Sequence, residues 1–380
     1  MPGNPPLIDF IRARIESAGP VTFRWFMEQA LYHPEHGYYS SGKGATGRGG
    51  DYFTNVSVGP LFGKMIAIQF REMWERMGAP AQFAIVEQGA NDGVFARDVL
   101  ESLQTDAPDF ARAARYVIVE PFPILEKRQR ETLAAFPGVQ WRGGVDALDP
   151  FRGVHFSNEL IDAMPLHVVK LAGGEWRERL VDWLDGAFAW ADAPLSSEKL
   201  RAHLEKLPLQ PGADCIAEVN LDAPDWLDAL TPRIEAGWIL IADYGHTRAA
   251  HFAPGRTGTL ACYSRHRRGD DPFQDAGLAD ITAHVDFTSI AEHAAALGMG
   301  VAGYADQHHF MAGLAQQAFP DTNEPPDPAK QKMLRAFTTL MHPNFMGMQF
   351  KFLALGKNLP DAADAPLSGF QFSPDASAAL

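Results

Sequence analysis

The sequence predicts an α/β fold with a doubly wound, mostly parallel sheet, an N-terminal helical segment and a substrate-side insertion. Short apolar runs of strand length alternate with stretches of helical period. The expected strands are 83–86, 116–119, 154–157 and 238–242. Because strands that alternate with helices form parallel sheets covered on both faces, we expect a Rossmann-like core.

The composition is that of a globular protein. The chain has 380 residues, of which 46% are hydrophobic and 21% charged, so it can form one large domain with an insertion or two domains. The formal net charge is −14. Nucleic-acid binding needs a concentrated basic surface, so we expect no nucleic-acid partner. The charge is compatible with a cationic substrate or partner, and it is also common among acidic cytosolic enzymes.

Cysteine usage and hydropathy bear on the compartment. The two cysteines, Cys215 and Cys262, are too few for a disulfide framework. The N-terminus lacks the pattern of a secretory or transit segment, and no window approaches the roughly 18 uninterrupted apolar residues of a membrane span. We therefore expect a cytoplasmic protein with no membrane partner, either a monomer or a homodimer.

Residues 1–78 are expected to form a helical segment and a glycine-rich lid. Apolar spacing in 6–31, interrupted at Gly19-Pro20, predicts two short helices. The glycine-rich and aromatic stretch 42–54 suits either a lid that excludes water or a disordered loop. A long amphipathic helix is expected from about Pro60 to Met77.

The rest of the chain is expected to divide into a core and later additions. Residues 79–245 form the expected core, with helices over 95–103 and 123–136. Alternation in 168–190, with glycines at the turns, predicts a hairpin inserted near 168–215. The remaining expected segments are a substrate-side insertion over 246–345, a closing strand over 346–357 and a flexible tail over 358–380.

A glycine turn follows the first expected core strand. Glu87, Gly89 and Gly93 lie between a strand and a helix, where glycines let the backbone approach a cofactor closely, and all three are expected to bind the cofactor. Asp92 would repel the pyrophosphate of a dinucleotide, whereas acidic residues suit S-adenosylmethionine, which carries an ammonium and a sulfonium. A plain strand-to-helix turn would also account for this motif.

An acidic residue follows the second expected core strand. Glu120 follows 116–119 and can accept hydrogen bonds from both hydroxyls of a ribose. A surface glutamate is the alternative interpretation. Together, the glycine turn and Glu120 favour S-adenosylmethionine over NAD, mainly by charge.

Several ordered motifs resemble the MidA-like family of class I S-adenosylmethionine-dependent methyltransferases. They run from about Leu7 to Leu355. The motifs are Tyr32–Tyr39, Gly50–Thr54, Pro60–Gly63, Val119–Pro121, Ser157–Pro165, Trp176–Arg179, Asp243–Gly245, Gly258–Leu260, Asp280–Phe287 and Gln349–Lys351. The resemblance implies a class I core with added substrate-side elements and S-adenosyl-L-methionine as the methyl donor. It also implies a protein arginine as acceptor, because the mitochondrial member dimethylates an arginine of a complex I subunit.

The chain departs from the family pattern at three places, one of which is Lys64, where the family usually has an acid. Gln88, Ala90, Asn91 and Asp92 stand within a turn that the family writes E-L-G-P-G-x-G. The tripeptide 55–57, Asn-Val-Ser, stands where the family has S-P-E. These changes leave the acceptor open, so the chain is interpreted either as an arginine methyltransferase or as a side branch with another acceptor.

Methyl transfer from a sulfonium requires the nucleophile, the methyl carbon and the sulfur to lie in line. An arginine acceptor suits a pair of carboxylates that grip the guanidinium. Glu159 and Asp162 lie beyond a strand end and are three residues apart, so a helical turn would place both on one face. We expect them to bind the acceptor, with Asn158 nearer the cofactor. Helix capping by first-turn acids is the alternative.

Other candidates complete the predicted site. Asp51 and Thr54 are expected at the cofactor, and Tyr244 follows a strand end and is expected at the substrate. His284 and Asp286 suit a base and its orienting carboxylate, although a structural histidine is an equal alternative. His266 is a further substrate candidate with the same ambiguity. We expect no metal, because His308-His309 has no third ligand at a suitable spacing.

The sequence leaves three functions open. The first is methylation of a protein arginine. The second is O- or N-methylation of a small molecule, which the altered residues favour. The third is a non-catalytic assembly factor that retains the fold.

Overall fold

The computed structural model describes residues 3–42, 54–208, 215–253, 258–264, 267–320, 327–360, 365–373 and 380. The chain divides into two compact units, each built from three stretches of sequence. The first unit, here called the small unit, comprises Met1–Phe53, Ile161–Trp226 and His246–Asp286. The second, the large unit, comprises Thr54–Leu160, Leu227–Gly245 and Phe287–Leu380.

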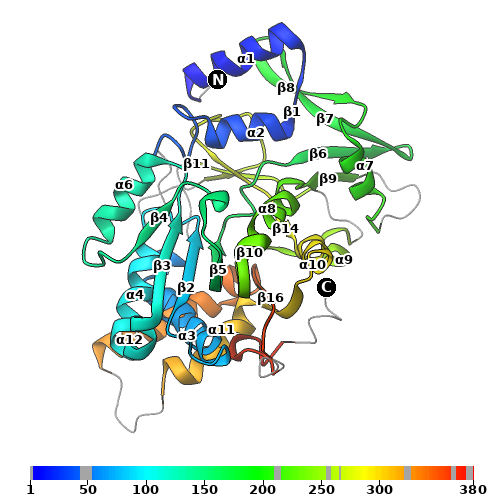
Figure 1. Cartoon of the computed structure of the whole chain (residues 1–380). Coiled ribbons are helices and arrows are strands. Elements are labelled where there is room, and N and C mark those ends of the chain that lie inside the picture. The colour runs from blue at the N-terminus through cyan, green and yellow to red at the C-terminus, as the bar shows by residue number, and fades with distance from the viewer. Residues whose placement is uncertain are drawn as a thin grey trace. The chain divides into compact units, whose positions relative to one another are not determined.

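The large unit is built on a doubly wound sheet. Its strands lie in the order β15-β16-β10-β5-β2-β3-β4 (Figure 1). The strands from β10 to β4 pair in parallel, and β16 pairs antiparallel with β10 and β15. Their bounds are β2 Phe83–Gln88, β3 Ala114–Val119, β4 Gln140–Arg142, β5 Phe151–Asn158, β10 Ile234–His246, β15 Gly300–Asp306 and β16 Phe350–Lys357. The four strands expected from sequence are confirmed.

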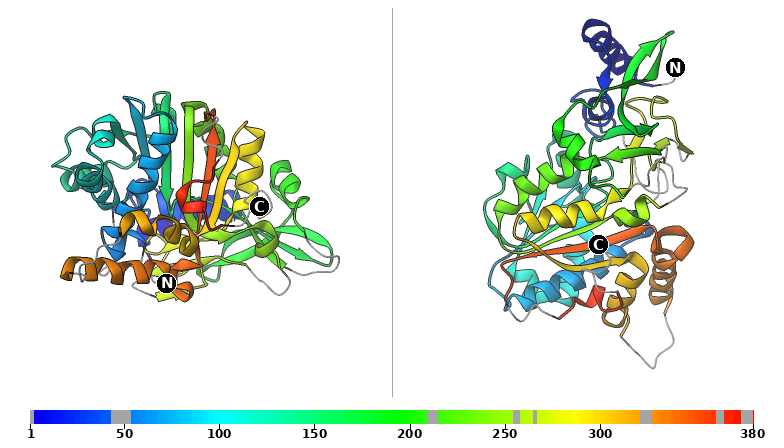
Figure 2. Two further views of the ribbon diagram at one scale, coloured as in Figure 1. Left: turned by 90° about the horizontal axis from the view of Figure 1, so that it is seen from below. Right: turned by 90° about the vertical axis from the view of Figure 1, so that its right-hand side faces the viewer.

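Helices cover both faces of this sheet. Figure 2 (right) shows α10 and α11 on opposite faces of β15 and β16. The helices are α3 Leu61–Arg76, α4 Val94–Asp106, α5 Pro108–Ala113, α6 Pro123–Thr132, α10 Phe287–Ala296, α11 Gln307–Ala318 and α12 Pro328–Met341. Helix α3 confirms the expected long helix and buries an apolar face that includes Phe62, Ile66 and Phe70. The expected helices after β2 and β3 are confirmed as α4 and α6.

The small unit is a helix pair on an antiparallel sheet. Helices α1 (Pro5–Ala18) and α2 (Phe23–Tyr32) confirm the two helices expected at the N-terminus. The sheet order is β1-β7-β6-β9, with β8 paired to β7. Its strands are β1 Val21–Thr22, β6 His167–Ala172, β7 Glu175–Leu184, β8 Ala187–Ala193 and β9 Cys215–Val219. The hairpin expected in 168–190 is therefore confirmed, with turns at the predicted glycines.

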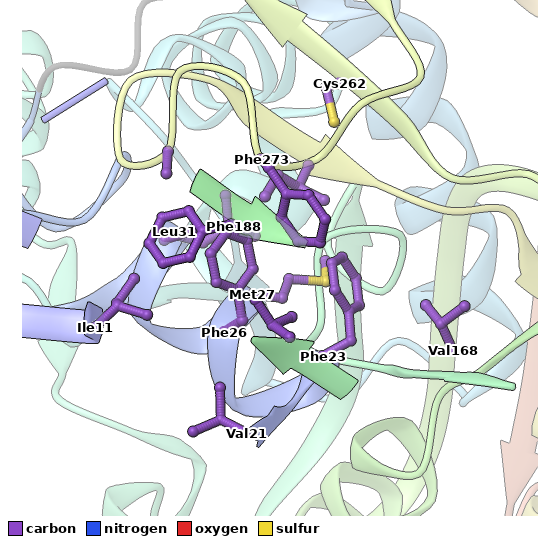
Figure 3. Packing of buried hydrophobic residues seen from close by; sticks show 14 of the residues in the cluster. Ile11, Val21, Phe23, Phe26, Met27, Leu31, Val168, Phe188, Cys262 and Phe273 are labelled. Carbon is purple, nitrogen blue, oxygen red and sulfur yellow. The ribbon is translucent and has the colours of Figure 1, made fainter. Parts of the chain in front are cut away.

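Aromatic side chains fill the core of the small unit. Phe23 and Phe26 of α2 pack with Phe188 and Phe273 (Figure 3). The Phe26 ring meets Phe188 at 5.3 Å and Phe273 at 5.4 Å between centroids, both in edge-on geometry. Such pairs add to the free energy gained from burial alone.

Short elements complete the small unit. They are α7 Glu198–Leu204, α9 Arg248–His251, β11 Ala261–Ser264, β12 Arg267–Gly269, β13 Asp280–Thr282 and β14 Val285–Asp286. Strands β12, β11 and β13 form a separate sheet in that order. Helix α8 (Asp222–Leu230) runs across the boundary at Trp226, where the chain passes to the large unit.

Two expectations about the second half of the chain were wrong. Residues 246–345 are not one insertion, because 300–306 form β15 at the edge of the large sheet. The tail is not flexible throughout, because Leu367 and Phe370 are buried. The backbone N–H of Gly369 donates to Gln69 at 3.0 Å, which ties the tail to α3. The tail's apolar residues gain burial that its Pro, Ala and Asp content did not suggest.

Candidate functional site

The candidate cofactor site lies at the carboxyl ends of β2, β3 and β5. In open α/β sheets, ligands bind beyond these ends where the strand order reverses. Here the chain runs from β2 to β3 on one side, and β5 pairs with β2 on the other. Gly89, Glu120 and Asn158 therefore stand at the ends of adjacent strands.

In the turn after β2, every second residue has a left-handed backbone conformation. Gly89, Asn91 and Gly93 have φ values of 82°, 46° and 77°. Asparagine is among the few residues besides glycine that adopt this conformation readily. Asn91 can therefore replace the glycine of the family pattern without changing the course of the turn. A Cβ at Gly89 would meet Leu160 and Asn158 at ordinary contact distances of 3.5 Å or more, so the left-handed φ, and not crowding, favours glycine here.

Glu120 is held with its carboxylate fixed. Its Oε1 accepts from the N–H of Phe122 at 2.9 Å, and its Oε2 accepts from Gln129 Nε2 at 2.7 Å. Burial raises the pKa of Glu120 to about 7, although both hydrogen bonds lower it. Each carboxylate oxygen keeps a second lone pair, so two ribose hydroxyls can still donate to it.

Gln129, which was not predicted as a site residue, connects the glycine turn to Glu120. The side chain is fully buried. Its Nε2 also donates to the carbonyl of Asn91 at 2.8 Å, while its Oε1 accepts from Trp141 Nε1 at 3.0 Å. A glutamine on the apolar side of α6, four residues after the buried Leu125, is the signal that could have found it.

Glu87 lies inside the large unit beneath the turn. Its Oε2 accepts from the hydroxyl of Tyr116 at 2.7 Å, and burial raises its pKa to about 7. In the neighbouring strand, burial lowers the pKa of His155 to about 3, so this imidazole stays neutral. Its Nε2 lies 3.3 Å from Gln88 Oε1. Glu87 is thus bound to a neighbouring strand of the sheet, and its contact with a cofactor stays a prediction.

A chain of polar side chains marks the end of β5. Asn55 Nδ2 donates to Asn158 Oδ1 at 3.2 Å, and Asn158 Nδ2 donates to Glu159 Oε1 at 2.8 Å. Nearby, Asp243 accepts from the N–H groups of Leu160 and Tyr244. Thr54 closes a small turn with Ser57, which holds Asn55 in place.

The helical turn expected after β5 is absent, which corrects the reasoning that paired Glu159 with Asp162. Residues 159–166, all of them described, contain no helix. Glu159 has a φ of 53°, outside the right-handed helical region, and its N–H donates to the carbonyl of Ala242. The chain passes between units after Leu160, so Glu159 belongs to the large unit and Asp162 to the small one.

Tyr244 lies within β10, because this strand extends beyond its predicted end. Its ring packs on Phe350 with centroids 4.0 Å apart.

In the small unit, Asp286 accepts from Arg248 Nε at 3.3 Å, and His284 N–H donates to Thr259 Oγ1 at 3.0 Å. The role of Asp286 in orienting His284 stays a prediction. Asp51 and His266 lie outside the described residues.

The small unit also brings tyrosines and carboxylates together. The hydroxyl of Tyr39 donates to Asp280 Oδ1 at 2.7 Å, and its ring stacks on Tyr32 at 5.6 Å. Burial, and then the charges of Asp280 and Asp162, raises the pKa of Tyr32. Asp162 is thus near a second buried acid, which the sequence analysis did not name as a site residue.

The residues at the strand ends fit S-adenosylmethionine. Glu120 presents free lone pairs, and the fully buried Asn55 keeps an Oδ1 atom without a partner among the described residues. These groups are acceptors, as a ribose and an ammonium require.

In the described ranges, no helix is long and apolar enough to span a membrane.

Comparisons with known proteins agree with this geometry. Residues 65–305 match the family described as S-adenosyl-L-methionine-dependent methyltransferases. The mitochondrial "Protein arginine methyltransferase NDUFAF7 homolog" of Drosophila melanogaster is 30% identical over 93% of this chain and 85% of its own length. Its human counterpart, "Protein arginine methyltransferase NDUFAF7, mitochondrial", is 26% identical over 92% of this chain and 83% of its own length.

A solved structure is similar over nearly the whole chain. It is a COG1565 superfamily member from Burkholderia thailandensis bound to S-adenosyl-homocysteine, with a TM-score of 0.86 and 30% identity over 99% of this chain and 97% of that one. S-adenosyl-homocysteine is the product that remains after S-adenosylmethionine has given up its methyl group. The chain therefore belongs to the S-adenosyl-L-methionine-dependent methyltransferase family, and it is an enzyme that uses this cofactor as its methyl donor.

Proposed function

We propose that this methyltransferase transfers the methyl group to an arginine side chain of a protein. The observation that carries the proposal is the similarity, over more than nine tenths of the chain, to relatives named as protein arginine methyltransferases. Carboxylates and tyrosines in the small unit, and the net charge of −14, suit a cationic acceptor.

In this proposal the strand ends of the large unit bind the methyl donor. Glu120 accepts hydrogen bonds from the ribose hydroxyls, with Gln129 and Phe122 holding its carboxylate in place. The backbone at Gly89 and the side chain of Asn158 bind the aminoacyl part. When bound, the cofactor supplies an electrophilic methyl group on a sulfonium. The positions of Asp51 and Thr54 at the cofactor remain part of the proposal.

Carboxylates act on the acceptor. The guanidinium has a pKa above 12, so it arrives protonated. Asp162 would accept hydrogen bonds from its N–H groups and orient one nitrogen for the transfer. It would take the proton that this nitrogen loses when the methyl group passes to it, while the sulfonium keeps the electron pair of the broken S–CH3 bond and leaves as a neutral thioether. Glu159, His284, Tyr244 and Asp286 keep their proposed roles at the acceptor, and each is tested by its own substitution.

The test uses the purified enzyme, labelled methyl donor and a lysate of the source cells. We expect label in protein, and methylated arginine after acid hydrolysis. Label in the small-molecule fraction alone would support the second function, a small-molecule methyltransferase. Binding of the cofactor without any transfer would support the assembly factor.

We also propose a cytoplasmic, reducing location and a monomeric or homodimeric state. The location is supported by the low cysteine content, since Cys215 and Cys262 are the only two cysteines in the sequence. Fractionation of the source cells and light scattering after size exclusion test these two points, and a higher oligomer would contradict the second.

A further inference from the structure

We propose that Asn55 binds the α-ammonium group of the methyl donor through its side-chain carbonyl oxygen. The proposal rests on the S-adenosylmethionine cofactor and not on the identity of the acceptor. It adds a residue from outside the Rossmann-like strand ends to the cofactor site.

The first observation is a buried acceptor without a partner. Asn55 is fully buried, and its Oδ1 atom has no hydrogen-bond partner among the described residues. Its backbone is fixed by the turn from Thr54, where the N–H of Val58 donates to the carbonyl of Asn55 at 3.3 Å. A buried acceptor left without a donor is unfavourable, so a ligand that supplies an N–H gains from this atom.

The second observation fixes which end of the amide is available. A carboxylate oxygen only accepts, so the Nδ2 of Asn158 must face Glu159 Oε1, at 2.8 Å. The Oδ1 of Asn158 then faces Asn55, whose Nδ2 must donate to it, at 3.2 Å. Rotating either amide would set two acceptors or two donors against each other. The acceptor oxygen of Glu159 therefore orients both amides, and Asn55 Oδ1 is the end left for a ligand.

The third observation concerns position. Asn55 contacts Asn158 at the end of β5, and the carbonyl of Asn158 lies 4.0 Å from the place a Cβ would take on Gly89. Glu120 stands at the end of β3, two strands from β5, which at the usual strand spacing is roughly 9–10 Å away. A nucleoside whose ribose meets Glu120 extends its amino-acid part toward β5. Its ammonium carries three N–H donors, which match the carbonyl of Asn55.

The experiment measures binding without turnover, by calorimetry. The two probes are S-adenosylhomocysteine and its analogue that lacks the α-amino group. Each is titrated into the wild-type enzyme, into Asn55→Leu and Asn55→Ala, and into a matched Asn344→Leu control at an exposed position of the large unit. Circular dichroism shows whether each variant is folded.

In the wild type and the control, loss of the amino group should weaken binding roughly 10- to 100-fold, as for a hydrogen bond to a charged group. In the Asn55 variants, the ratio of the dissociation constants of the two probes should be roughly tenfold smaller than in the wild type. Equal weakening of both probes, or no change in their ratio, would overturn the proposal. These binding ratios do not depend on the acceptor. If the enzyme does not methylate arginine, the expected ratios therefore stay the same.

A second measurement needs no variant. In a crystal structure of the wild type with S-adenosylhomocysteine, Asn55 Oδ1 should lie within hydrogen-bond distance of the ammonium nitrogen, roughly 2.7–3.2 Å. An Oδ1 atom turned toward another donor, or an ammonium beyond that distance, would contradict the proposal even if the variants do not fold.

Discussion

The two units of this enzyme place their polar side chains in different ways. In the large unit, Glu120 and Asn158 follow directly after parallel strands, so the sheet itself brings them to one edge. In the small unit, Tyr39, Asp162 and Asp280 come from three separate parts of the chain. In the proposed function the large unit binds the invariant donor at these strand ends, and the small unit supplies groups for the acceptor. The predictions below test this division from its largest expected effect to its smallest.

The largest effect is expected at Asp162. Asp162→Asn should reduce methyl transfer roughly 10²- to 10⁴-fold, because the amide cannot take a proton from the acceptor. The affinity for S-adenosylhomocysteine should stay within about twofold. Initial rates and calorimetry measure the two quantities. Asp185→Asn, at an exposed turn with a φ of 51°, is the matched control. A parallel loss of cofactor affinity would show that Asp162 does not act on the acceptor alone.

Removal of Glu120 should act on the donor. Glu120→Ala should weaken S-adenosylhomocysteine binding roughly 10- to 100-fold, because two hydrogen bonds to a charged acceptor are lost. Glu131→Ala, an exposed glutamate of the following helix α6, is the control for calorimetry. An unchanged dissociation constant would remove Glu120 from the cofactor site.

Gln129 should matter for stability as well as for binding. Gln129→Leu leaves the carbonyl of Asn91, the carboxylate of Glu120 and the indole N–H of Trp141 without their partner. We expect the free energy of unfolding to fall by about 2–4 kcal/mol. Urea denaturation measures this change, with the exposed Gln331→Leu as control. A stability equal to that of the wild type would mean that these groups find other partners.

The smallest effect is a dependence on pH. Glu120 has a pKa of about 7 in the folded enzyme and an ordinary value of 4.5. Its contribution to stability is therefore full below about pH 4.5 and is lost as the pH rises through about 7. Cofactor affinity should change in the opposite direction, since the ionised carboxylate accepts both ribose hydroxyls. Calorimetry between pH 5.5 and 8 should show tighter binding at the upper end, and Glu120→Gln should flatten the profile.

The sequence predicted the large unit better than the small one for a physical reason. Buried parallel strands and the glycine turn are local patterns, so β2, β3, β5 and Gly89 could be located before the structure was known. Glu159 shows the limit, because its left-handed backbone depends on a hydrogen bond to Ala242 in another strand. Asn55 could not be assigned from local pattern, because its partner is 103 residues away. The apolar spacing around Gln129 indicated a buried glutamine, but not its contact with Asn91, which is 38 residues away.

The position of β16 has a consequence for biosynthesis. This strand lies between β10 and β15 in the sheet, yet it follows both in the sequence. All the segments of the small unit have been translated by residue 286, whereas the facing edges of β10 and β15 find their partner after residue 350 has been made. Until then the nascent chain carries two open strand edges, which are the places where polypeptides associate wrongly. Premature termination before β16 would leave those edges permanently exposed.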